Sequence, residues 1–444
     1  MAILIAPTAK RPNVRVIGGG LAGVEAAHFL SRAGIHVDLF EMRPQNKTPA
    51  HKTDLLAELV CSNSFKGFDP LTAHGILKRE MSELGSIVLS TAEKTSVPAG
   101  KALAVDRMAF SSLITRHFEN HPMVTLHRQE VKKTDLDCAT IIATGPLTSD
   151  ELAKDLSLKT GSSRLFFYDA ISPIIDADSI DMNYAFFGAR WSDDSQDYLN
   201  CPLDEGQYKR FMEELLNADR VRAREFEDAR FFEACLPIEI LAARGADALR
   251  YGPMRPVGLR SPSTGRRPYA VVQLRRENLP GNAYNMVGFQ TRLTYAEQRR
   301  IMGLIPGLAS ARYLRYGSIH RNTFLDSPRV LEPSLRLSGL SNTFIAGQIT
   351  GVEGYMESAA TGILAGISMA AWLGEKPFIP PGPDTAMGAL IHYITDRSMG
   401  IFEPMNINFG IMTMPDVHKS KRVQARSEIA SASFARWKGS LPFI

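Results

Sequence analysis

The sequence is poor in cysteine, with four cysteines among 444 residues. They are Cys61, Cys138, Cys201 and Cys235, and no two of them form a CxxC pair. So few and so widely spaced thiols do not support a disulfide framework, a zinc site or a dithiol redox motif. We therefore expect no metal site and a protein of a reducing compartment, the cytoplasm.

The sequence also lacks a long hydrophobic run. The longest apolar stretch, Ala359 to Leu373, is too short to span a bilayer comfortably and contains two glycines. The first thirteen residues have too short an apolar run for a signal peptide. We interpret the stretch from Ala359 as a buried helix and expect no membrane partner.

Neither sign of charge is in large excess. The chain has 51 Lys and Arg residues against 47 Asp and Glu residues, a formal net charge of +4. This balance does not by itself establish a nucleic-acid partner. Arginines are crowded between Arg220 and Arg336, where they could form a basic face for phosphates. An ordinary solvated surface explains them equally well.

Glycines near the N-terminus form the clearest motif of the chain. A predicted strand, Val14 to Ile17, runs into Gly18-Gly19-Gly20-Leu21-Ala22-Gly23 and then into a helix through Ser31. A second predicted strand, Val37 to Phe40, ends at Glu41. A strand, a GxGxxG loop, a helix and an acidic residue about 20 positions on are typical of dinucleotide binding.

Each position of this loop has a physical role. Gly18 makes the tight turn, Gly20 lets a pyrophosphate approach the backbone, and Gly23 lets the helix pack closely on the sheet. The helix N-terminus would face the phosphates, and Glu41 could accept hydrogen bonds from ribose hydroxyls. A merely structural turn is the alternative.

A second glycine element near the C-terminus favours FAD over NAD. The predicted strand Thr343 to Ala346 enters Gly347-Gln348-Ile349-Thr350-Gly351, and a long helix follows from about Tyr355 to Leu373. In two-part flavin folds such an element returns to the flavin ring, where a helix N-terminus stabilises negative charge. Gly145 would add a backbone contact to the dinucleotide. A plain strand–helix turn is the alternative.

The region between these elements differs in character, since it mixes aromatic residues, prolines and turn signals. We predict an α/β protein in which a Rossmann-like FAD-binding domain is interrupted by an α+β insertion domain, with a short C-terminal helical segment. The predicted boundaries are 14–146 and 316–375 for the two parts of the FAD-binding domain, 147–315 for the insertion, and 376–444 for a C-terminal segment with a basic tail.

Cys235 is the cysteine whose surroundings most favour chemistry. It precedes Pro237, and proline suits the first position of a helix, which we expect to run to Gly245. The positive end of the helix dipole would then favour the reactive thiolate. Glu233 and Glu239 flank Cys235 and would oppose a thiolate unless they point away or an arginine outweighs them. A buried structural cysteine is the alternative.

The remaining cysteines carry weaker signals. Cys138 falls in the apolar pattern of 137–144, so we expect it to be structural in a buried strand. Cys201 lies between Asn200 and Pro202, and we expect a loop residue without chemistry.

Longer motifs carry a resemblance to a known family. They are 58–64 (ELVCSNS), 97–100 (VPAG), 102–107 (ALAVDR), 232–239 (FEACLPIE), 252–254 (GPM), 272–275 (VQLR), 287–292 (VGFQTR), 320–324 (HRNTF) and 346–358. Through these segments the chain, from about Val14 to Gly410, resembles the folate- and FAD-dependent tRNA (uracil-5-)-methyltransferases, TrmFO, which are related to the GidA-type flavoproteins.

This resemblance implies an activity and site residues. The family transfers a one-carbon unit from 5,10-methylenetetrahydrofolate to carbon 5 of uridine 54 in the T-loop of tRNA, with reduced FAD as hydride donor and NAD(P)H to regenerate it. Cys235 matches the nucleophile that adds to uracil carbon 6. Cys61 matches the second site cysteine and is the candidate general base or assisting thiol. Whether Cys61 merely packs is left open.

The expected RNA partner gives the basic residues a possible role. Extracting a uridine from a folded loop costs on the order of a few kcal/mol. The candidates for holding the displaced backbone are Arg266, Arg267, Arg275 and Arg276, with Arg422 and Arg426 in the tail. The same chemistry on a ribosomal-RNA uridine, or a flavin-containing RNA-binding protein without catalysis, are the alternatives. The sequence does not reveal which protein partners the chain has.

Overall fold

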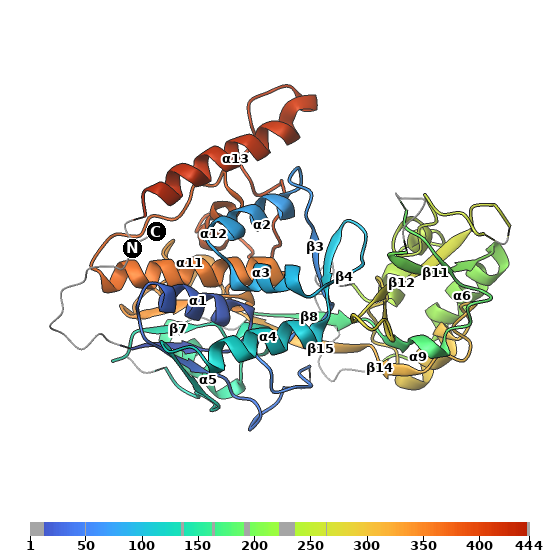
Figure 1. The fold of residues 1–444 in the computed structure, drawn as a ribbon, viewed down its shortest axis with the longest axis horizontal. Coiled ribbons are helices and arrows are strands. Elements are labelled where there is room, and N and C mark those ends of the chain that lie inside the picture. Colours follow the sequence, from blue (N-terminus) through green and yellow to red (C-terminus); the bar gives the residue numbers. More distant parts are fainter. Residues whose placement is uncertain are drawn as a thin grey trace.

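The computed structural model describes residues 13–48, 50–134, 137–161, 165–190, 196–221, 236–262 and 264–441, with the backbone alone at 165–169, 320 and 321. The chain forms two lobes (Figure 1). The larger lobe contains the first and last thirds of the chain, and the smaller lobe contains the middle third. The two lobes meet along a narrow neck.

A parallel sheet forms the centre of the larger lobe. Its strand order is β16-β7-β1-β2-β6. The strands are β1 (Val14–Ile17), β2 (Val37–Phe40), β6 (Val124–His127), β7 (Thr140–Ile142) and β16 (Thr343–Ile345). All four strand pairings are parallel. A parallel sheet covered on both faces needs short apolar strands, which is why the sequence pattern identified β1, β2 and β16 correctly.

Two helices that are far apart in sequence pack side by side on this sheet. They are α1 (Leu21–Arg32) and α11 (Tyr355–Leu373). A Cβ at Gly362 would lie 2.2 Å from the Ala22 carbonyl oxygen, so glycine permits the close approach. By length and composition α11 is apolar enough to cross a membrane, but its residues from Met356 to Ala371 are buried in this core. The predicted buried helix is therefore confirmed.

Further helices and a small sheet complete the larger lobe. They are α2 (Ala73–Glu83), α3 (Ile87–Lys94), α4 (Arg107–Glu119), α5 (Asp150–Thr160), α10 (Ser327–Val330), α12 (Ala386–Thr395), and the strands β3 (Ser64–Gly67), β4 (Ser96–Val97) and β5 (Ala102–Val105). Leu152 and Leu156 of α5 pack with Ile17, Ile142 and Ile345 of the parallel sheet. The predicted boundary at 147 therefore differs from the packing, which places α5 with the larger lobe.

The smaller lobe is an α+β unit with its own core. Its antiparallel sheet has the order β10-β11-β12-β13-β9-β14. The elements are β9 (Ile174–Asp176), β10 (Phe186–Phe187), β11 (Tyr198–Leu203), α6 (Glu205–Asn217), α7 (Ile238–Ala242), α8 (Ala248–Tyr251), β12 (Ala270–Arg276), β13 (Ala283–Met286), α9 (Tyr295–Met302) and β14 (Tyr313–Arg315). This lobe is the inserted domain.

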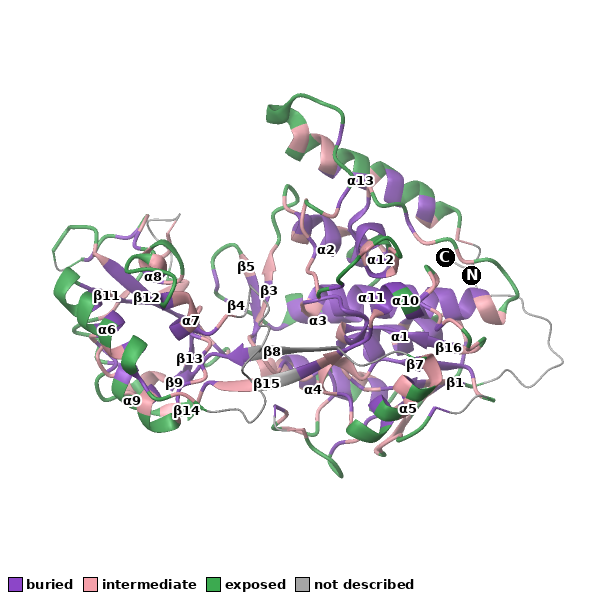
Figure 2. Ribbon diagram, turned by 180° about the vertical axis from the view of Figure 1, so that it is seen from behind, coloured by how far each residue is buried: buried purple, intermediate pink, exposed green. Residues whose placement is uncertain are grey.

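Two strands connect the lobes. β8 (Leu165–Ile171) leads out to the insertion, β15 (Ser318–Phe324) leads back, and the two pair antiparallel. The pair crosses the neck between the lobes (Figure 2). A two-stranded connection fixes where the insertion stands relative to the parallel sheet. The insertion therefore extends from about residue 172 to about residue 317.

The predicted C-terminal helical segment is present as α13 (Arg422–Gly439), preceded by a 3-10 turn (Lys419–Lys421). It lies along the outer side of the larger lobe (Figure 1). The Arg79 guanidinium donates to the Ser427 carbonyl at 2.9 Å, which ties α13 to α2. Arg426 lies over the Phe409 ring, with 4.7 Å between the guanidinium carbon and the ring centroid, so this residue has a packing role.

Two cysteine predictions are wrong. Cys138 precedes β7 and is half-buried, because the strand covers only three residues of the apolar pattern. Cys201 lies in the central part of β11, with no exposed surface, and burial raises the pKa of its thiol to about 12. An inert buried thiol agrees with the expectation that Cys201 has no chemistry.

Candidate functional site

A cavity lies at the carboxyl ends of the parallel strands, with an empty volume of about 980 Å3 that includes space open to solvent. Open α/β sheets bind ligands at this edge, where the strand order reverses. Its lining includes Gly18, Gly19, Gly20, Leu21, Ala22, Glu41, Arg43, Glu58, Val60, Gly145, Gly347, Gln348 and Tyr355. Nine of the eleven predicted cofactor-binding residues are therefore brought together, and Gly23 and Gly351 stand outside the lining.

The glycine loop has the shape that a pyrophosphate site needs. Gly18 has φ +106°, and a Cβ there would lie 2.5 Å from the Ala143 carbonyl oxygen. A Cβ at Gly23 would lie 1.8 Å from the Gly18 carbonyl oxygen, so only glycine lets α1 stand this close to β1. At Gly20 a Cβ would meet nothing within 4 Å, and no side chain caps α1. The N-terminus of α1 therefore begins beside an open space, where the N–H groups of its first turn could bind a phosphate.

The acidic residue after β2 is held by a buried arginine. The Arg43 Nε donates to Glu41 Oε1 at 2.8 Å and Nη2 donates to Oε2 at 3.1 Å, while the Gly19 N–H donates to Oε2 at 3.2 Å. Burial raises the pKa of Glu41, but the hydrogen bonds and charge of Arg43 outweigh it, so the pKa is lowered. Glu41 is therefore an ionised acceptor, and a ribose hydroxyl would have to replace one of these donors.

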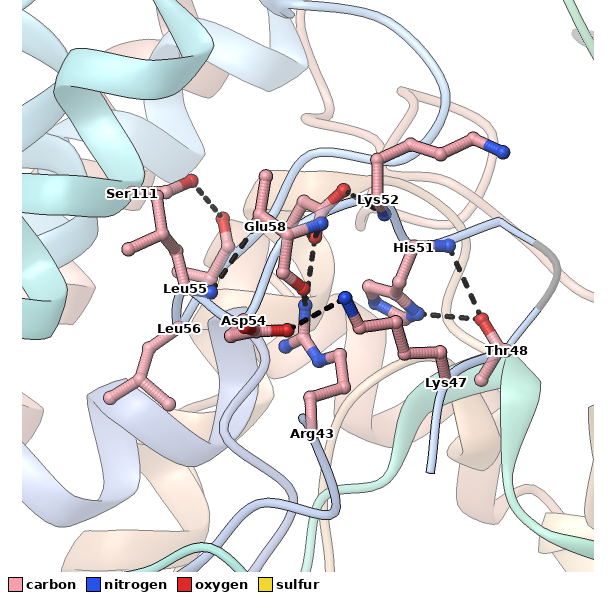
Figure 3. Close-up of polar contacts among 12 residues, drawn as sticks. Arg43, Lys47, Thr48, His51, Lys52, Asp54, Leu55, Leu56, Glu58 and Ser111 are labelled. Atoms are coloured by element: carbon pink, nitrogen blue, oxygen red, sulfur yellow. Dashed lines mark hydrogen bonds and ion pairs between the residues drawn. The ribbon is translucent and has the colours of Figure 1, made fainter. Parts of the chain in front are cut away.

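Arg43 also joins β2 to the loop that leads to Cys61 (Figure 3). Its Nη1 donates to Glu58 Oε2 at 2.8 Å. The Glu58 carboxylate also accepts from the Thr53 N–H and hydroxyl and from the Lys52 N–H. Arg43 is only 1% exposed. One guanidinium therefore bridges two carboxylates at the wall of the cavity and fixes the course of 52–58.

The second glycine element contributes two residues to the cavity. Gly347 has φ +84°, and its N–H donates to the Thr361 hydroxyl of α11 at 2.8 Å. Gln348 follows in the lining. Gly351 has φ +86°, but a Cβ there would lie 2.4 Å from the Phe402 ring. Close packing on Phe402 explains this glycine, which does not reach the cavity.

Cys61 lies beside the cavity, between Val60, which lines it, and Ser62. The Tyr355 hydroxyl accepts from the N–H groups of Cys61 at 2.8 Å and Ser62 at 3.1 Å. Tyr355 begins α11 and also lines the cavity. The Tyr355 hydroxyl therefore positions the backbone of the Cys61 loop.

Three arginines from both lobes surround the Cys61 loop. Arg107 donates to the Leu59 and Cys61 carbonyls and pairs with Glu277. Arg315 donates to the Val60 carbonyl at 3.0 Å, and Arg275 donates to the Asn63 amide oxygen at 2.9 Å. All three guanidiniums interact electrostatically with Cys61. Burial lowers the pKa of Arg275 and Arg315 and raises that of Glu277. The Cys61 loop therefore forms the contact between the two lobes.

Cys235 and Glu233 lie outside the described residues. The description resumes at Leu236, and Pro237 is the N-cap of α7, which ends at Ala242, earlier than predicted. The Glu239 carboxylate accepts from the Thr291 hydroxyl and the Arg292 N–H, both at 2.9 Å, and is fully buried. Burial raises the pKa of Glu239 above its ordinary value. Its bonds tie it to residues 291–292, in the loop between β13 and α9.

The predicted RNA-contacting arginines separate into two groups. Arg266 and Arg267 are exposed on the insertion, and Arg276 is half-buried. Arg275 is 7% exposed and bonded at the neck, so it is not an RNA contact in this structure. Sequence reasoning did not assign roles to Arg43, Glu58, Arg107, Glu277 and Arg315. Glu58 and Arg107 stand in quoted family motifs, which was the available signal.

Comparison with known proteins identifies similar chains. The family model described as "Glucose inhibited division protein A" matches residues 13–377. A relative named methylenetetrahydrofolate–tRNA-(uracil-5-)-methyltransferase TrmFO, from Syntrophus aciditrophicus, is 50% identical over 97% of this chain and 98% of its own length. The relative of that name from Listeria welshimeri is 51% identical over 94% of this chain and 95% of its own.

A solved structure shows the same fold at low identity. The structure of Aquifex aeolicus GidA in its form II crystal has a TM-score of 0.70 and 19% identity, and the match covers 99% of this chain and 75% of that one. The shared fold agrees with the α/β architecture and the interrupting insertion.

Proposed function

We propose that this chain, which belongs to the TrmFO family of methylenetetrahydrofolate–tRNA-(uracil-5-)-methyltransferases, methylates carbon 5 of a uracil in tRNA. The one-carbon donor is 5,10-methylenetetrahydrofolate and the cofactor is FAD. Relatives about half identical over nearly the whole chain favour this activity over a ribosomal-RNA target or a non-catalytic RNA-binding role.

One structural observation carries the proposal: the cavity lined by the glycine loop also includes Val60 and Tyr355, which adjoin Cys61, and the Cys61 loop contacts the smaller lobe. The glycine loop, Glu41 and Gly145 would hold the adenosine and pyrophosphate parts of FAD. Gly347 and Gln348 would lie against its ring. A bound FAD supplies a carrier for the one-carbon unit and the hydride that completes the methyl group.

The two cysteines would act on the uracil. Carbon 5 of uracil is a poor nucleophile. A thiolate that adds to carbon 6 converts the ring into an enolate, in which carbon 5 is nucleophilic. We assign the addition to Cys235. After carbon 5 has taken the one-carbon unit, Cys61 accepts the carbon 5 proton as the bond between that unit and its carrier breaks. Hydride transfer to the one-carbon unit then completes the methyl group, and the Cys235–carbon 6 bond breaks to release the thiolate. The arginines around Cys61 hold its backbone in place for this proton transfer.

Finer features belong to the same proposal. The target is the T-loop uridine 54, NADH or NADPH reduces the FAD, and the enzyme works in the cytoplasm, where tRNA and folates are found. The exposed Arg266 and Arg267 stand on the insertion lobe, which supports a role for that lobe in holding RNA.

The test uses the flavoprotein, unmodified tRNA, methylenetetrahydrofolate labelled at the transferred carbon, and NADH or NADPH. Nucleoside analysis should find labelled 5-methyluridine at position 54. If label appeared in ribosomal RNA alone, the substrate would be ribosomal RNA and not tRNA. If no RNA were labelled, the proposed enzymatic activity would be wrong.

A further inference from the structure

Three tyrosines form a stack on the insertion lobe that the proposed chemistry does not use. The rings of Tyr295 and Tyr316 lie 4.6 Å apart with 20° between their planes, and those of Tyr316 and Tyr313 lie 4.8 Å apart with 9° between their planes. In the described part of the chain Tyr295 and Tyr313 do not contact each other. They therefore cover opposite faces of Tyr316, which is the middle ring.

Hydrogen bonds to Gln298 hold the segments that carry the three tyrosines. The Tyr313 hydroxyl donates to the Gln298 carbonyl at 3.2 Å, and burial raises the pKa of Tyr313. The Gln298 amide, which has no exposed surface, donates to the carbonyls of Leu293 and Gly317 and accepts from the Gly317 N–H. The loop that carries Tyr316 and the start of α9 that carries Tyr295 are thus bound to one side chain.

The outer end of the stack is open to solvent. Tyr295 is 58% exposed although one of its faces is covered by Tyr316, so the exposed surface is its other face and its edge. Positions around α9 and β14 lie at the surface of the smaller lobe (Figure 2). Large exposed aromatic surface is costly in water unless a partner covers it. An ordered ring with one open face is the usual platform for an unpaired nucleobase.

A positive charge stands beside the platform. An Nη of Arg299 donates to the Tyr316 hydroxyl at 3.2 Å, with the guanidinium carbon 5.8 Å from the ring centroid. Among the described residues Arg299 has no carboxylate partner, whereas the neighbouring Arg300 is paired with Glu297 and Glu214. A stacked ring could hold a base, and a guanidinium without a carboxylate partner among the described residues could bind the phosphate of that nucleotide.

The platform lies close in sequence to residues that contact the Cys61 loop and α7. Tyr316 follows Arg315, whose guanidinium reaches the Val60 carbonyl in the Cys61 loop. Tyr295 lies three positions after Arg292, whose N–H holds Glu239 of α7. A base on Tyr295 would therefore lie near the contact between the lobes.

From this placement we infer that the stack of Tyr295, Tyr316 and Tyr313 is a binding site for an unpaired nucleobase of the RNA substrate, with Arg299 at its phosphate. The inference rests on the proposed function, because it takes RNA to be the substrate. The proposed RNA contacts of the insertion lobe then include a stacking site for a base as well as the basic residues Arg266 and Arg267.

The test measures binding of the FAD-loaded enzyme to a T-arm hairpin carrying 2-aminopurine in its loop, and to a blunt RNA duplex of equal length. Stacking on a protein aromatic ring is worth about 1–3 kcal/mol per base, so Tyr295→Ala should weaken hairpin binding about 5- to 150-fold. Binding of the duplex should change less than about twofold. The wild-type enzyme should quench the fluorescence of 2-aminopurine at the loop position that stacks on Tyr295, and Tyr295→Ala should not.

Two variants test whether the loss of binding comes from the ring of Tyr295 or from removing any exposed tyrosine of this lobe. Tyr295→Phe keeps the ring and should bind the hairpin within about twofold of wild type. Tyr184→Ala removes an insertion-lobe tyrosine of the same 58% exposure and should leave hairpin binding unchanged. FAD absorbance per chain checks that each variant is folded.

Three outcomes would overturn the inference: unchanged hairpin binding by Tyr295→Ala, an equal loss of hairpin and duplex binding, or an equal loss in Tyr184→Ala. Methyl transfer by the wild-type enzyme to whole tRNA is measured separately. If wild type does not methylate tRNA, the proposed function fails, whereas the platform fails only in the binding comparison.

Discussion

Replacing Arg43 with methionine tests whether one guanidinium fixes the wall of the cofactor cavity. The substitution keeps much of the apolar stem but removes three side-chain bonds to carboxylates, two to Glu41 and one to Glu58. Removing one partner of a buried ion pair costs about 3–5 kcal/mol, because the other charge stays buried. Glu58 keeps its bonds to Lys52 and Thr53, so most of the loss falls on Glu41.

The pH dependence of this loss has a definite sign. In the native protein the pKa of Glu41 lies below its ordinary value of 4.5, so its stabilising effect is present above about pH 4.5 and is lost as the pH falls through the native pKa. In the variant, burial acts without Arg43 and raises the pKa of Glu41. The variant should therefore lose most stability near pH 7 and less near pH 5, where protonation relieves the buried charge.

The assay is urea unfolding of the apoprotein at both pH values, followed by FAD titration. The matched control is Lys47→Met, in the same loop, which breaks an exposed pair with Asp54 (Figure 3). That pair should contribute less than about 1 kcal/mol. The reasoning is refuted if Arg43→Met and Lys47→Met lower the free energy of unfolding equally, or if the loss from Arg43→Met grows toward pH 5.

Three further predictions concern the catalytic thiol, the glycine loop and a buried carboxyl group. Cys235→Ala should retain FAD, as measured by its absorbance, and lose 5-methyluridine formation. Full methylation by this variant would exclude Cys235 as the nucleophile. Gly23→Ala places a methyl group 1.8 Å from the Gly18 carbonyl oxygen, so it should cost about 1–3 kcal/mol in urea unfolding and weaken FAD binding. A wild-type FAD affinity would show that the loop adjusts freely. Glu80, buried and accepting the Ala386 and Met387 N–H groups, has its pKa raised by burial to about 8. Its native form keeps the proton that the unfolded chain releases near pH 4.5, so its effect on the free energy of unfolding declines by at most about 1.4 kcal/mol per pH unit between pH 4.5 and 8. Unfolding of wild type and Glu80→Gln from pH 5 to 8 should show a stability difference that shifts toward the variant as pH rises, and a constant difference would contradict this.

Several elements could be predicted from the sequence because their signals are local. The strands β1 and β2, the glycine loop between them and the buried helix α11 each follow from residues within one short segment. Their patterns reflect backbone geometry and burial, which neighbouring residues determine together. The insertion was recognisable for the same reason, since its composition changes along the chain.

The predictions for Cys138 and Cys201 failed because the sequence pattern did not show where the neighbouring strands begin and end. Cys138 belongs to an apolar pattern, but the strand it seemed to join begins at Thr140. Cys201 is followed by proline, yet it lies inside β11, where it pairs with Val272. Pro202 also lies within β11, so at this position proline does not mark a turn. The role of Cys235 stays a prediction, because the residue lies outside the described part of the chain.

The sequence by itself determined a dinucleotide-binding α/β domain with an insertion, and its motifs indicated the methyltransferase family. Only the tertiary structure decided that Arg43 joins Glu41 to Glu58, that Arg315 reaches Val60 in the Cys61 loop across 255 positions, and that three tyrosines form one stack. The physical reason is that sheet register and the two-stranded neck bring these side chains together, and no local pattern records which distant residues will meet.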